Sequence, residues 1–311
     1  MTLPDSPLTP ELVRRIIVEE EISLRCKTLP QDMVETIFRY GAIIGSVVEA
    51  HPLLTRGMDR ARDLIRRAEQ SGRSLASGTT IIAREMTASR GRFQRPWHAP
   101  VGGLWLTVIV ADTLLPENSR LYPLAAGAAC CETLRHHNIP AFVKWVNDVH
   151  VRGRKIAGIL TTTETGPLYG EEYVLIGIGI NANNDSFPPE LRKTATSMRT
   201  ELDSNVDINR LAARLLAKLA WSVGLLHHEE QKRLNNRGTT ATETRDRHPL
   251  LDLWQRLSDI QGRRVRFGYD VQTEPQFDAV VQGIDAQGGL LLKLVDGRIT
   301  MENCGEIIYL D

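Results

Sequence analysis

The sequence carries no net charge, because 38 Lys and Arg residues balance 38 Asp and Glu residues. No overall field therefore attracts nucleic acid or an anionic membrane, and recognition of an anion must be local. No run approaches the roughly 18 apolar residues that a membrane helix requires. The first residues also lack a basic segment followed by an apolar run. We therefore expect a cytoplasmic protein without a membrane partner.

Cysteine and histidine offer no metal-binding pattern. The four cysteines, Cys26, Cys130, Cys131 and Cys304, have no metal-ligand spacing, and the adjacent pair lies in an apolar helical run. We expect reduced, mostly buried thiols. Residues 227–228 are adjacent histidines in a charged stretch, which favours exposure over metal binding. With 311 residues, 42% of them apolar, the chain can bury a sizeable core and divide into more than one domain.

Three arginines crowd one short segment, residues 85–97, between two apolar runs. Arg90, Arg92 and Arg95 each offer a planar fork of donors that suits phosphate or carboxylate. Gly91 allows the backbone to approach a ligand closely. The segment therefore predicts an anion-binding loop, with a solvated basic loop as the alternative.

Three later segments follow in order, Lys-Trp-Val-Asn-Asp at 144–148, Gly-Arg-Lys-Ile-Ala-Gly-Ile-Leu at 153–160 and Gly-Ile-Gly-Ile-Asn-Ala-Asn at 177–183. With the arginine segment, their order and spacing resemble the catalytic domain of biotin protein ligases. The corresponding family signatures are GRGRxxRxW, KWPND, GRK-x-x-GIL and GIGxNxN. The resemblance covers about residues 45–200, and a weaker match continues to the C-terminus.

Hydrophobic periodicity predicts alternating helices and strands. The expected helices begin at Thr9-Pro10 and at Pro30 or cover residues 58–69, 123–136 and 207–226. The expected strands cover residues 43–48, 79–85, 104–111 and 173–182, with a hairpin over 141–149 and 155–162. Short glycine-punctuated strands around residues 265–267, 279–281, 290–292 and 307–309 predict a small β-barrel.

These patterns and the resemblance imply an α+β fold. The expected catalytic domain is class II synthetase-like, of the biotin/lipoate ligase kind with a mixed or antiparallel sheet, followed by an SH3-like β-barrel. The expected divisions are a helical N-terminal extension at 1–40, the catalytic domain at 41–226, a flexible polar connector at 227–249 and the SH3-like domain at 250–311.

The resemblance implies a reaction in two steps. The biotin carboxylate attacks the α-phosphate of ATP, and a lysine of a biotin carboxyl carrier protein then captures the acyl-adenylate. Both steps concentrate negative charge, so cationic side chains and Mg²⁺ are expected to neutralise the reacting groups. The arginine loop is expected to shield the mixed anhydride from water.

The resemblance also assigns roles to residues. Lys155 aligns with the catalytic lysine, with Arg90, Arg92 and Arg95 beside it, and Asp148 is the expected metal ligand. The expected ligand-binding residues are Trp97, Lys144, Asn147, Asp148, Gly177, Gly179, Asn181, Gly91, Met86 and Thr87. Lys144 has two alternatives, pairing with Asp148 or contacting phosphate. The alternate glycines also suit a close-packing site without a ligand.

Departures from the family pattern cluster where the biotin ring would lie. Residues 56–59 read Arg-Gly-Met-Asp, without the hydroxyls usual in the family, and Met86 stands where a glutamine usually contacts the ureido group. Unpaired polar groups on a buried ligand cost about 1–3 kcal/mol each. We therefore expect weakened biotin binding.

Two other functions remain open at this point. One is a ligase or transferase of the same fold that acts on lipoate or octanoate, and the other is a non-catalytic binding protein. The expected N-terminal extension is shorter than a usual domain, so we expect no DNA binding. By analogy, the family also implies a homodimer.

Overall fold

The computed structural model describes residues 7–184, 186–235 and 247–310. Their strands form a seven-stranded sheet in the order β1-β2-β3-β7-β6-β5-β4 and a five-stranded sheet in the order β11-β10-β9-β8-β12. Only the β1–β2 pair among these strands is parallel, so the larger sheet is mixed and the smaller one antiparallel. The α+β prediction is confirmed.

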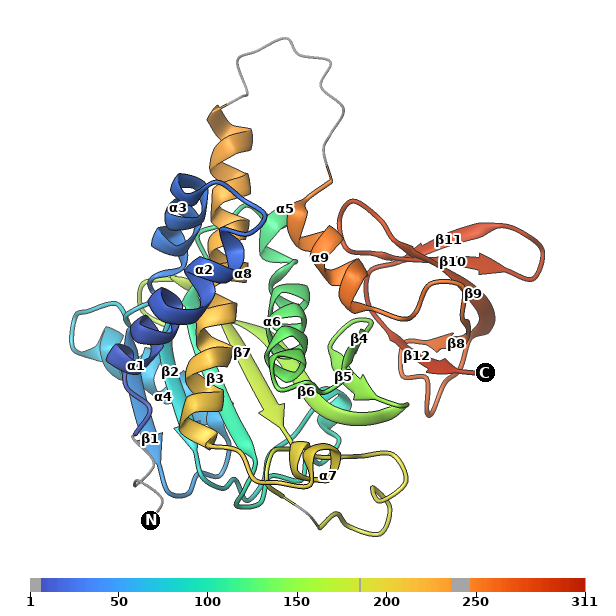
Figure 1. Ribbon diagram of the computed structural model, residues 1–311, viewed down its shortest axis with the longest axis horizontal. Coiled ribbons are helices and arrows are strands. Elements are labelled where there is room, and N and C mark those ends of the chain that lie inside the picture. The colour runs from blue at the N-terminus through green and yellow to red at the C-terminus, as the bar shows by residue number, and fades with distance from the viewer. Residues whose placement is uncertain (1–6, 185, 236–246, 311) are drawn as a thin grey trace.

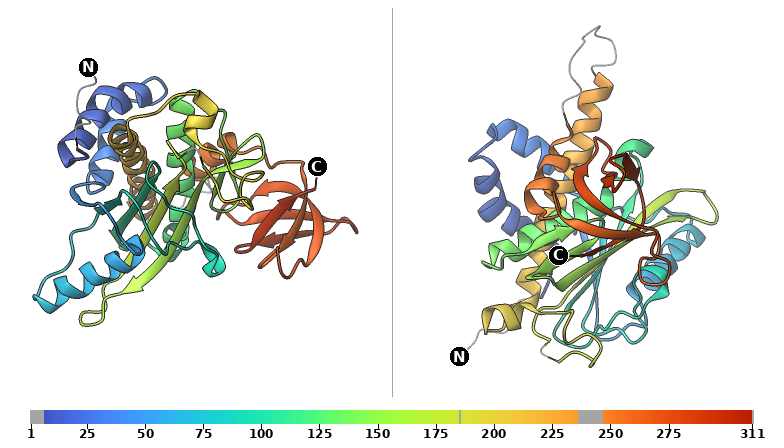
Figure 2. Two further views of the ribbon diagram at one scale, coloured as in Figure 1. Left: turned by 90° about the horizontal axis from the view of Figure 1, so that it is seen from below. Right: turned by 90° about the vertical axis from the view of Figure 1, so that its right-hand side faces the viewer.

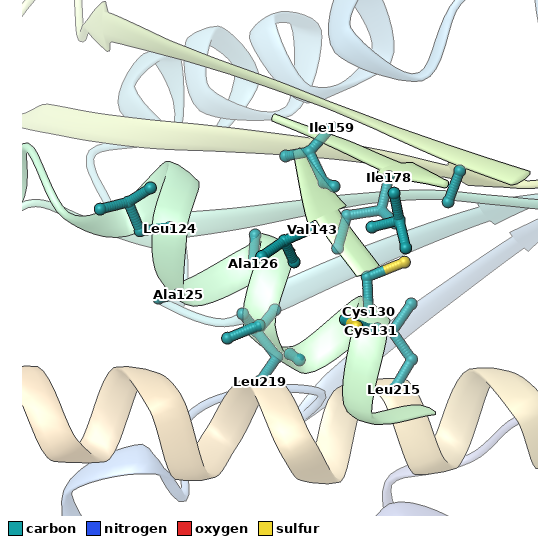
Figure 3. Close-up of a cluster of buried hydrophobic side chains, with 14 of the residues drawn as sticks. Leu124, Ala125, Ala126, Cys130, Cys131, Val143, Ile159, Ile178, Leu215 and Leu219 are labelled. Atoms are coloured by element: carbon teal, nitrogen blue, oxygen red, sulfur yellow. The ribbon is translucent and has the colours of Figure 1, made fainter. Parts of the chain in front are cut away.

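The strands of the larger sheet are β1 (Val47–His51), β2 (Thr79–Ala83), β3 (Leu104–Ala111), β4 (Phe142–Lys144), β5 (Asp148–Val151), β6 (Arg154–Thr165) and β7 (Glu172–Ile180). Two helices cover one of its faces, α6 (Tyr122–His136) and α8 (Ile208–Asn235). Figure 3 shows buried side chains from α6, α8 and the strands meeting there. Cys130 and Cys131 are fully buried in this layer, whereas Cys304 is exposed, so the expectation of burial fails for Cys304.

Helix α4 (Gly57–Gln70) covers the opposite face. Met58, Ala61 and Ile65 pack there against the sheet, in a second and smaller apolar cluster. The cluster covers only part of this face of the sheet. The candidate site lies on the part that the cluster leaves open.

The N-terminal helices are α1 (Pro10–Ile16), α2 (Ile22–Arg25) and α3 (Gln31–Gly41), with a π-helical turn at Ile17–Glu21. They lie alongside α8 (Figure 1). The predicted start of the first helix at Thr9-Pro10 is confirmed, and Thr9 Oγ1 caps the helix by accepting from Leu12 N at 3.2 Å. A buried ion pair joins Lys218 of α8 to Glu21 at 2.6 Å, with side chains 2% and 1% exposed. These helices therefore belong to the main core.

The strand predicted at residues 43–48 is wrong. Residues 42–45 form a turn in which Gly45 has φ of 73° and donates its N–H to Gly78 O at 3.0 Å. The strand begins only at Val47. A positive φ at glycine interrupts an apolar run that otherwise resembles a strand.

The expected end of the long helix at residue 226 is also wrong. α8 continues to Asn235, because Glu230 is buried and accepts hydrogen bonds from Leu115 N at 2.9 Å and from Asn118 Nδ2 at 2.7 Å. Polar composition alone does not reveal such a buried carboxylate. Within the remainder of the expected connector, residues 236–246 lie outside the described residues.

The C-terminal part starts with α9 (Pro249–Leu257), a helix that the sequence analysis did not predict. The strands β8 (Arg264–Gly268), β9 (Phe277–Ile284), β10 (Leu290–Leu294), β11 (Ile299–Glu302) and β12 (Glu306–Tyr309) follow. Figure 2 shows these strands beside the larger sheet rather than stacked on it. Four of the five strands were predicted, and β11 was missed. No helix of the described residues is long and apolar enough to cross a membrane.

Candidate functional site

Glycines open a space on the α4 face of the large sheet. Across β3, β7 and β6, Trp105, Gly179 and Gly158 lie side by side, and two residues further along each strand Thr107, Gly177 and Leu160 do the same. Because side chains alternate between faces with a period of two, the glycines leave adjacent gaps on one face.

The indole of Trp97 fills part of this space. A Cβ at Gly179 would lie 2.8 Å from Trp97 Nε1, and a Cβ at Gly158 would lie 3.0 Å from Trp97 Cζ3. Trp97 also meets Trp105 edge to face, with ring centroids 6.4 Å apart. The indole of Trp97 thus packs against Gly179, and its ring forms the floor of the space that remains.

Lys155 and Asp148 form an ion pair beside this ring. Lys155 Nζ lies 2.6 Å from Asp148 Oδ1 and 5.2 Å from the centroid of the Trp97 ring. Hydrogen bonds fix the Lys155 backbone on both sides, from Lys155 N to Thr194 O at 2.7 Å and from Thr196 N to Lys155 O at 3.0 Å. The ammonium is thus held at a defined place by a strand and a neighbouring loop.

Charges around Asp148 keep its carboxylate ionised. Burial opposes ionisation, but the Lys155 ammonium and His150, whose Nε2 is 3.8 Å from Asp148 Oδ2, hold the pKa of Asp148 well below its ordinary value. Burial lowers the pKa of Lys144, Asp148 raises it, and the cation of Lys155 adds to the lowering. Lys144 Nζ also lies 5.1 Å from the centroid of the Tyr309 ring.

Two asparagines of the motifs, Asn147 and Asn181, bond to backbone. Asn147 Nδ2 donates to Ile159 O at 2.6 Å, and Asn181 Nδ2 donates to Thr196 O at 3.0 Å. Asn147 thereby ties the β4–β5 connection to β6. Asn181 ties the end of β7 to the loop that also fixes Lys155. Both side chains position the residues around them.

The arginine loop contacts the C-terminal sheet. Arg95 forms a double hydrogen bond to Glu306, at 2.9 and 3.0 Å, and a further ion pair with Asp270. Burial acts to lower the pKa of Arg95, and the Glu306 and Asp270 carboxylates outweigh it and raise that pKa. Arg92 Nη1 donates to Gly305 O at 2.7 Å. Arg90 instead donates to Gln94 at 3.4 Å and is exposed.

Most of these groups line one cavity of about 590 Å³. Of the predicted site residues, its wall contains Lys155, Arg90, Gly91, Arg92, Arg95, Trp97, Lys144, Asn147, Asp148, Gly177, Gly179, Asn181 and Met86. Thr87 is not part of the wall and donates its N–H to Leu54 O at 3.0 Å. The cavity therefore brings together residues from segments that are far apart in the sequence.

The cavity also contains residues that the sequence analysis missed. The C-terminal sheet and its turns contribute Val271, Gln272, Glu306, Ile307, Ile308 and Tyr309. The loop after β7 contributes Phe187, Leu191, Thr194 and Ala195. No local motif marks these positions, because they reach the cavity only through the packing of the two sheets.

The other end of the cavity is apolar. Met58 is buried there, and Met86 and Leu160 complete the wall. A cavity with cations at one end and apolar side chains at the other suits one class of ligand, a carboxylic acid with an apolar tail.

Comparison with known proteins narrows this class. The sequence profile described as the biotin/lipoate A/B protein ligase family matches residues 65–181. The bifunctional ligase/repressor BirA of Escherichia coli (strain K12) is 31% identical over 235 residues, which are 75% of this chain and 67% of that protein. The biotin–[acetyl-CoA-carboxylase] ligase of Mycobacterium tuberculosis (strain H37Rv) is 30% identical over 262 residues, 80% of this chain and 84% of that protein.

A solved structure agrees in fold. The biotin protein ligase of Aquifex aeolicus in complex with biotin and ATP aligns over 85% of this chain and 98% of that chain, with a TM-score of 0.66 and 20% identity. By contrast, the chain spans about half the length of two Bacillus relatives, 47% and 55%. The chain belongs to the biotin/lipoate A/B protein ligase family.

Proposed function

We propose that the protein is an ATP-dependent biotin protein ligase, which forms biotinyl-5′-AMP and transfers biotin to a lysine of a biotin carboxyl carrier protein. The observation that carries this proposal is the meeting of Lys155, Asp148 and the arginine loop in one cavity with an apolar end. The name of the Mycobacterium tuberculosis relative, a biotin–[acetyl-CoA-carboxylase] ligase, supports the choice of acid.

Lys155 is the proposed catalytic residue. The carboxylate of the acid and the α-phosphate of ATP repel each other, and the ammonium at this position attracts both. In the first step the carboxylate oxygen bonds to the α-phosphorus and pyrophosphate leaves. In the second step the amine of the carrier lysine bonds to the acyl carbon and AMP leaves. Arg90, exposed at the same cavity, is the proposed phosphate contact.

Asp148 is the proposed ligand for Mg²⁺. In the described part of the chain, no group of three or more His, Cys, Asp and Glu side chains is placed to hold a metal ion by itself. One ionised carboxylate beside a nucleotide site nevertheless fits Mg²⁺, which is usually held by one or two carboxylates and by substrate phosphates. When bound, the ion supplies neutralisation of phosphate charge.

The test is adenylation itself. With biotin, ATP and Mg²⁺, we expect pyrophosphate exchange and biotinyl-adenylate by mass spectrometry, and biotin on a lysine once a carrier domain is added. Exchange with lipoate or octanoate but not with biotin would replace the proposal with the lipoate/octanoate alternative. No exchange with any acid would favour a non-catalytic binding protein.

The setting of this activity completes the proposal. We propose that the enzyme is cytoplasmic. We also propose that it lacks repressor function, because α1 and α3 pack against α8 as part of the main core. A salt-dependent shift of DNA by this chain would contradict that. Pairing of subunits is proposed by analogy with the family, and sedimentation of the unliganded and adenylate-bound protein tests it.

A further inference from the structure

The polarity of the cavity wall changes sharply from one end to the other. Lys144, Asp148 and Lys155 carry the charges at one end. Met58, which is 7% exposed, forms the buried end together with Met86 and Leu160. An acid in this cavity therefore places its carboxylate beside Lys155 and its tail among apolar side chains.

Two methionines shape the buried end. Met58 lies on the first turn of α4, and a Cβ at Gly177 would lie 3.1 Å from its Cε. Met86 is held in place by its backbone, which bridges to Leu54 on one side and to Ala99 on the other. Its N–H donates to Ala99 O at 3.0 Å. Both thioethers are thus held by rigid elements, as a specificity-determining group requires.

Two polar groups near this end have partners within the protein. Gly57 N, at the start of α4, donates to Met86 Sδ at 3.3 Å. Arg56 Nε is 3.7 Å from Asp59 Oδ2. The Thr107 hydroxyl also lies in this wall, 2.4 Å from where a Cβ at Gly57 would be. Apart from Arg56 and Thr107, the wall that meets the tail is thioether and aliphatic carbon.

We infer that Met58 and Met86 make this enzyme select its acid by the shape and apolar surface of the tail rather than by hydrogen bonds to it. The inference rests on the proposed function and specifies its substrate class. The site takes compact pentanoic acids that carry a small ring, and lipoate is a substrate alongside biotin. Lipoate has the same chain length and a sulfur-containing ring, and it lacks the ureido group.

The size of the effect follows from what an apolar pocket can distinguish. Apolar contacts separate similar ligands by about 10- to 200-fold, whereas a site built to hydrogen-bond a ligand rejects the analogue without that group by about 10⁴-fold or more. We therefore expect the kcat/KM for adenylation of biotin to exceed that of lipoate by less than about 200-fold.

The experiment measures pyrophosphate exchange by the full chain with biotin and with lipoate. Met86→Gln keeps the length of the side chain and adds an amide donor and acceptor at the buried end. We expect this variant to raise the biotin to lipoate ratio about tenfold, because its amide pairs with the ureido group and stays unpaired beside lipoate. Met33→Gln, an exposed methionine of α3, is the matched control and leaves the ratio unchanged.

Each outcome decides the inference. A wild-type ratio below about 200 that rises in Met86→Gln supports it. A wild-type ratio above this limit overturns the inference and leaves the proposed function intact. A folded Met86→Gln variant whose ratio is unchanged or lower has the same consequence. If thermal melting shows Met86→Gln unfolded, the wild-type ratio alone decides. No exchange with either acid overturns the proposed function itself.

Discussion

The ion pair between Arg95 and Glu306 gives the sharpest prediction. We expect Glu306→Gln to loosen the arginine loop, because the substitution keeps the shape of the side chain and removes the charge that Arg95 contacts at 2.9 and 3.0 Å. Hydrogen bonds to charged groups contribute about 1.5–3 kcal/mol, and exposed ion pairs at most about 1 kcal/mol. The side chains are 31% and 17% exposed, so an intermediate value of about 1.5 kcal/mol is appropriate.

That energy corresponds to about a tenfold larger population of the open loop. Hydrogen exchange of the amides at residues 90–96 should speed up by about the same factor. The fraction of adenylate released into solution per turnover should rise as well, because an open loop admits water. Glu274→Gln, an exposed residue near the same edge, is the control. Unchanged exchange in Glu306→Gln would refute the idea that the C-terminal sheet holds the loop.

Three further predictions concern activity, acid stability and the N-terminal helices. Lys155→Ala should slow adenylation by about 100-fold or more while circular dichroism stays native, and normal turnover would remove Lys155 from its proposed role. Burial and the charge of Arg233 lower the pKa of His248 from 6.5 to about 4, so stability should fall as the pH drops through this window, by at most about 3 kcal/mol. Urea unfolding of His248→Asn, in which an amide oxygen replaces the ring Nδ1 as the cap acceptor, should show a flatter pH profile there, and an equally steep profile would contradict this assignment. Lys218→Met should cost about 3 kcal/mol because it leaves Glu21 buried without its closest cation, and the double variant with Glu21→Gln should recover most of that loss if the pair, rather than lost packing, is responsible.

Local hydrophobic patterns predicted those helices and strands whose pattern lies entirely within the element itself. β3 has the predicted bounds, Leu104–Ala111, because eight residues in succession are apolar or β-branched. α4 begins at Gly57 and ends at Gln70, within one residue of the prediction. α6 likewise begins at Tyr122, one residue early. Strong periodicity over a full element leaves few alternatives.

The failures depend on contacts between distant segments. The helical end at Asn235 depends on Glu230 meeting Leu115 and Asn118, which are more than a hundred residues away. α9 begins with a cap in which His248 Nδ1 accepts from Leu250 N at 3.1 Å. The residues that precede α9 are polar, so this part of the chain resembled a connector in composition. Composition averages over such pairs and does not show them.

The candidate site shows the same division. Motif spacing predicted which residues gather, and the cavity contains nearly all of them. The directions of the side chains were not predicted. Arg92 and Arg95 contact Gly305 and Glu306, more than two hundred residues away, and the ring of Trp97 lies over Gly179. Such orientations depend on tertiary packing, about which a motif carries no information.

The shared wall of the cavity limits how this protein can be recombined. Because Val271, Ile307 and Tyr309 of the C-terminal part line the same space as Lys155, that part is not a module that can be exchanged freely among relatives. A chimera that joins residues 1–235 to the C-terminal part of a relative would have a mismatched cavity wall. The chimera should regain activity only when its C-terminal part also carries this chain's residues that face Arg92 and Arg95.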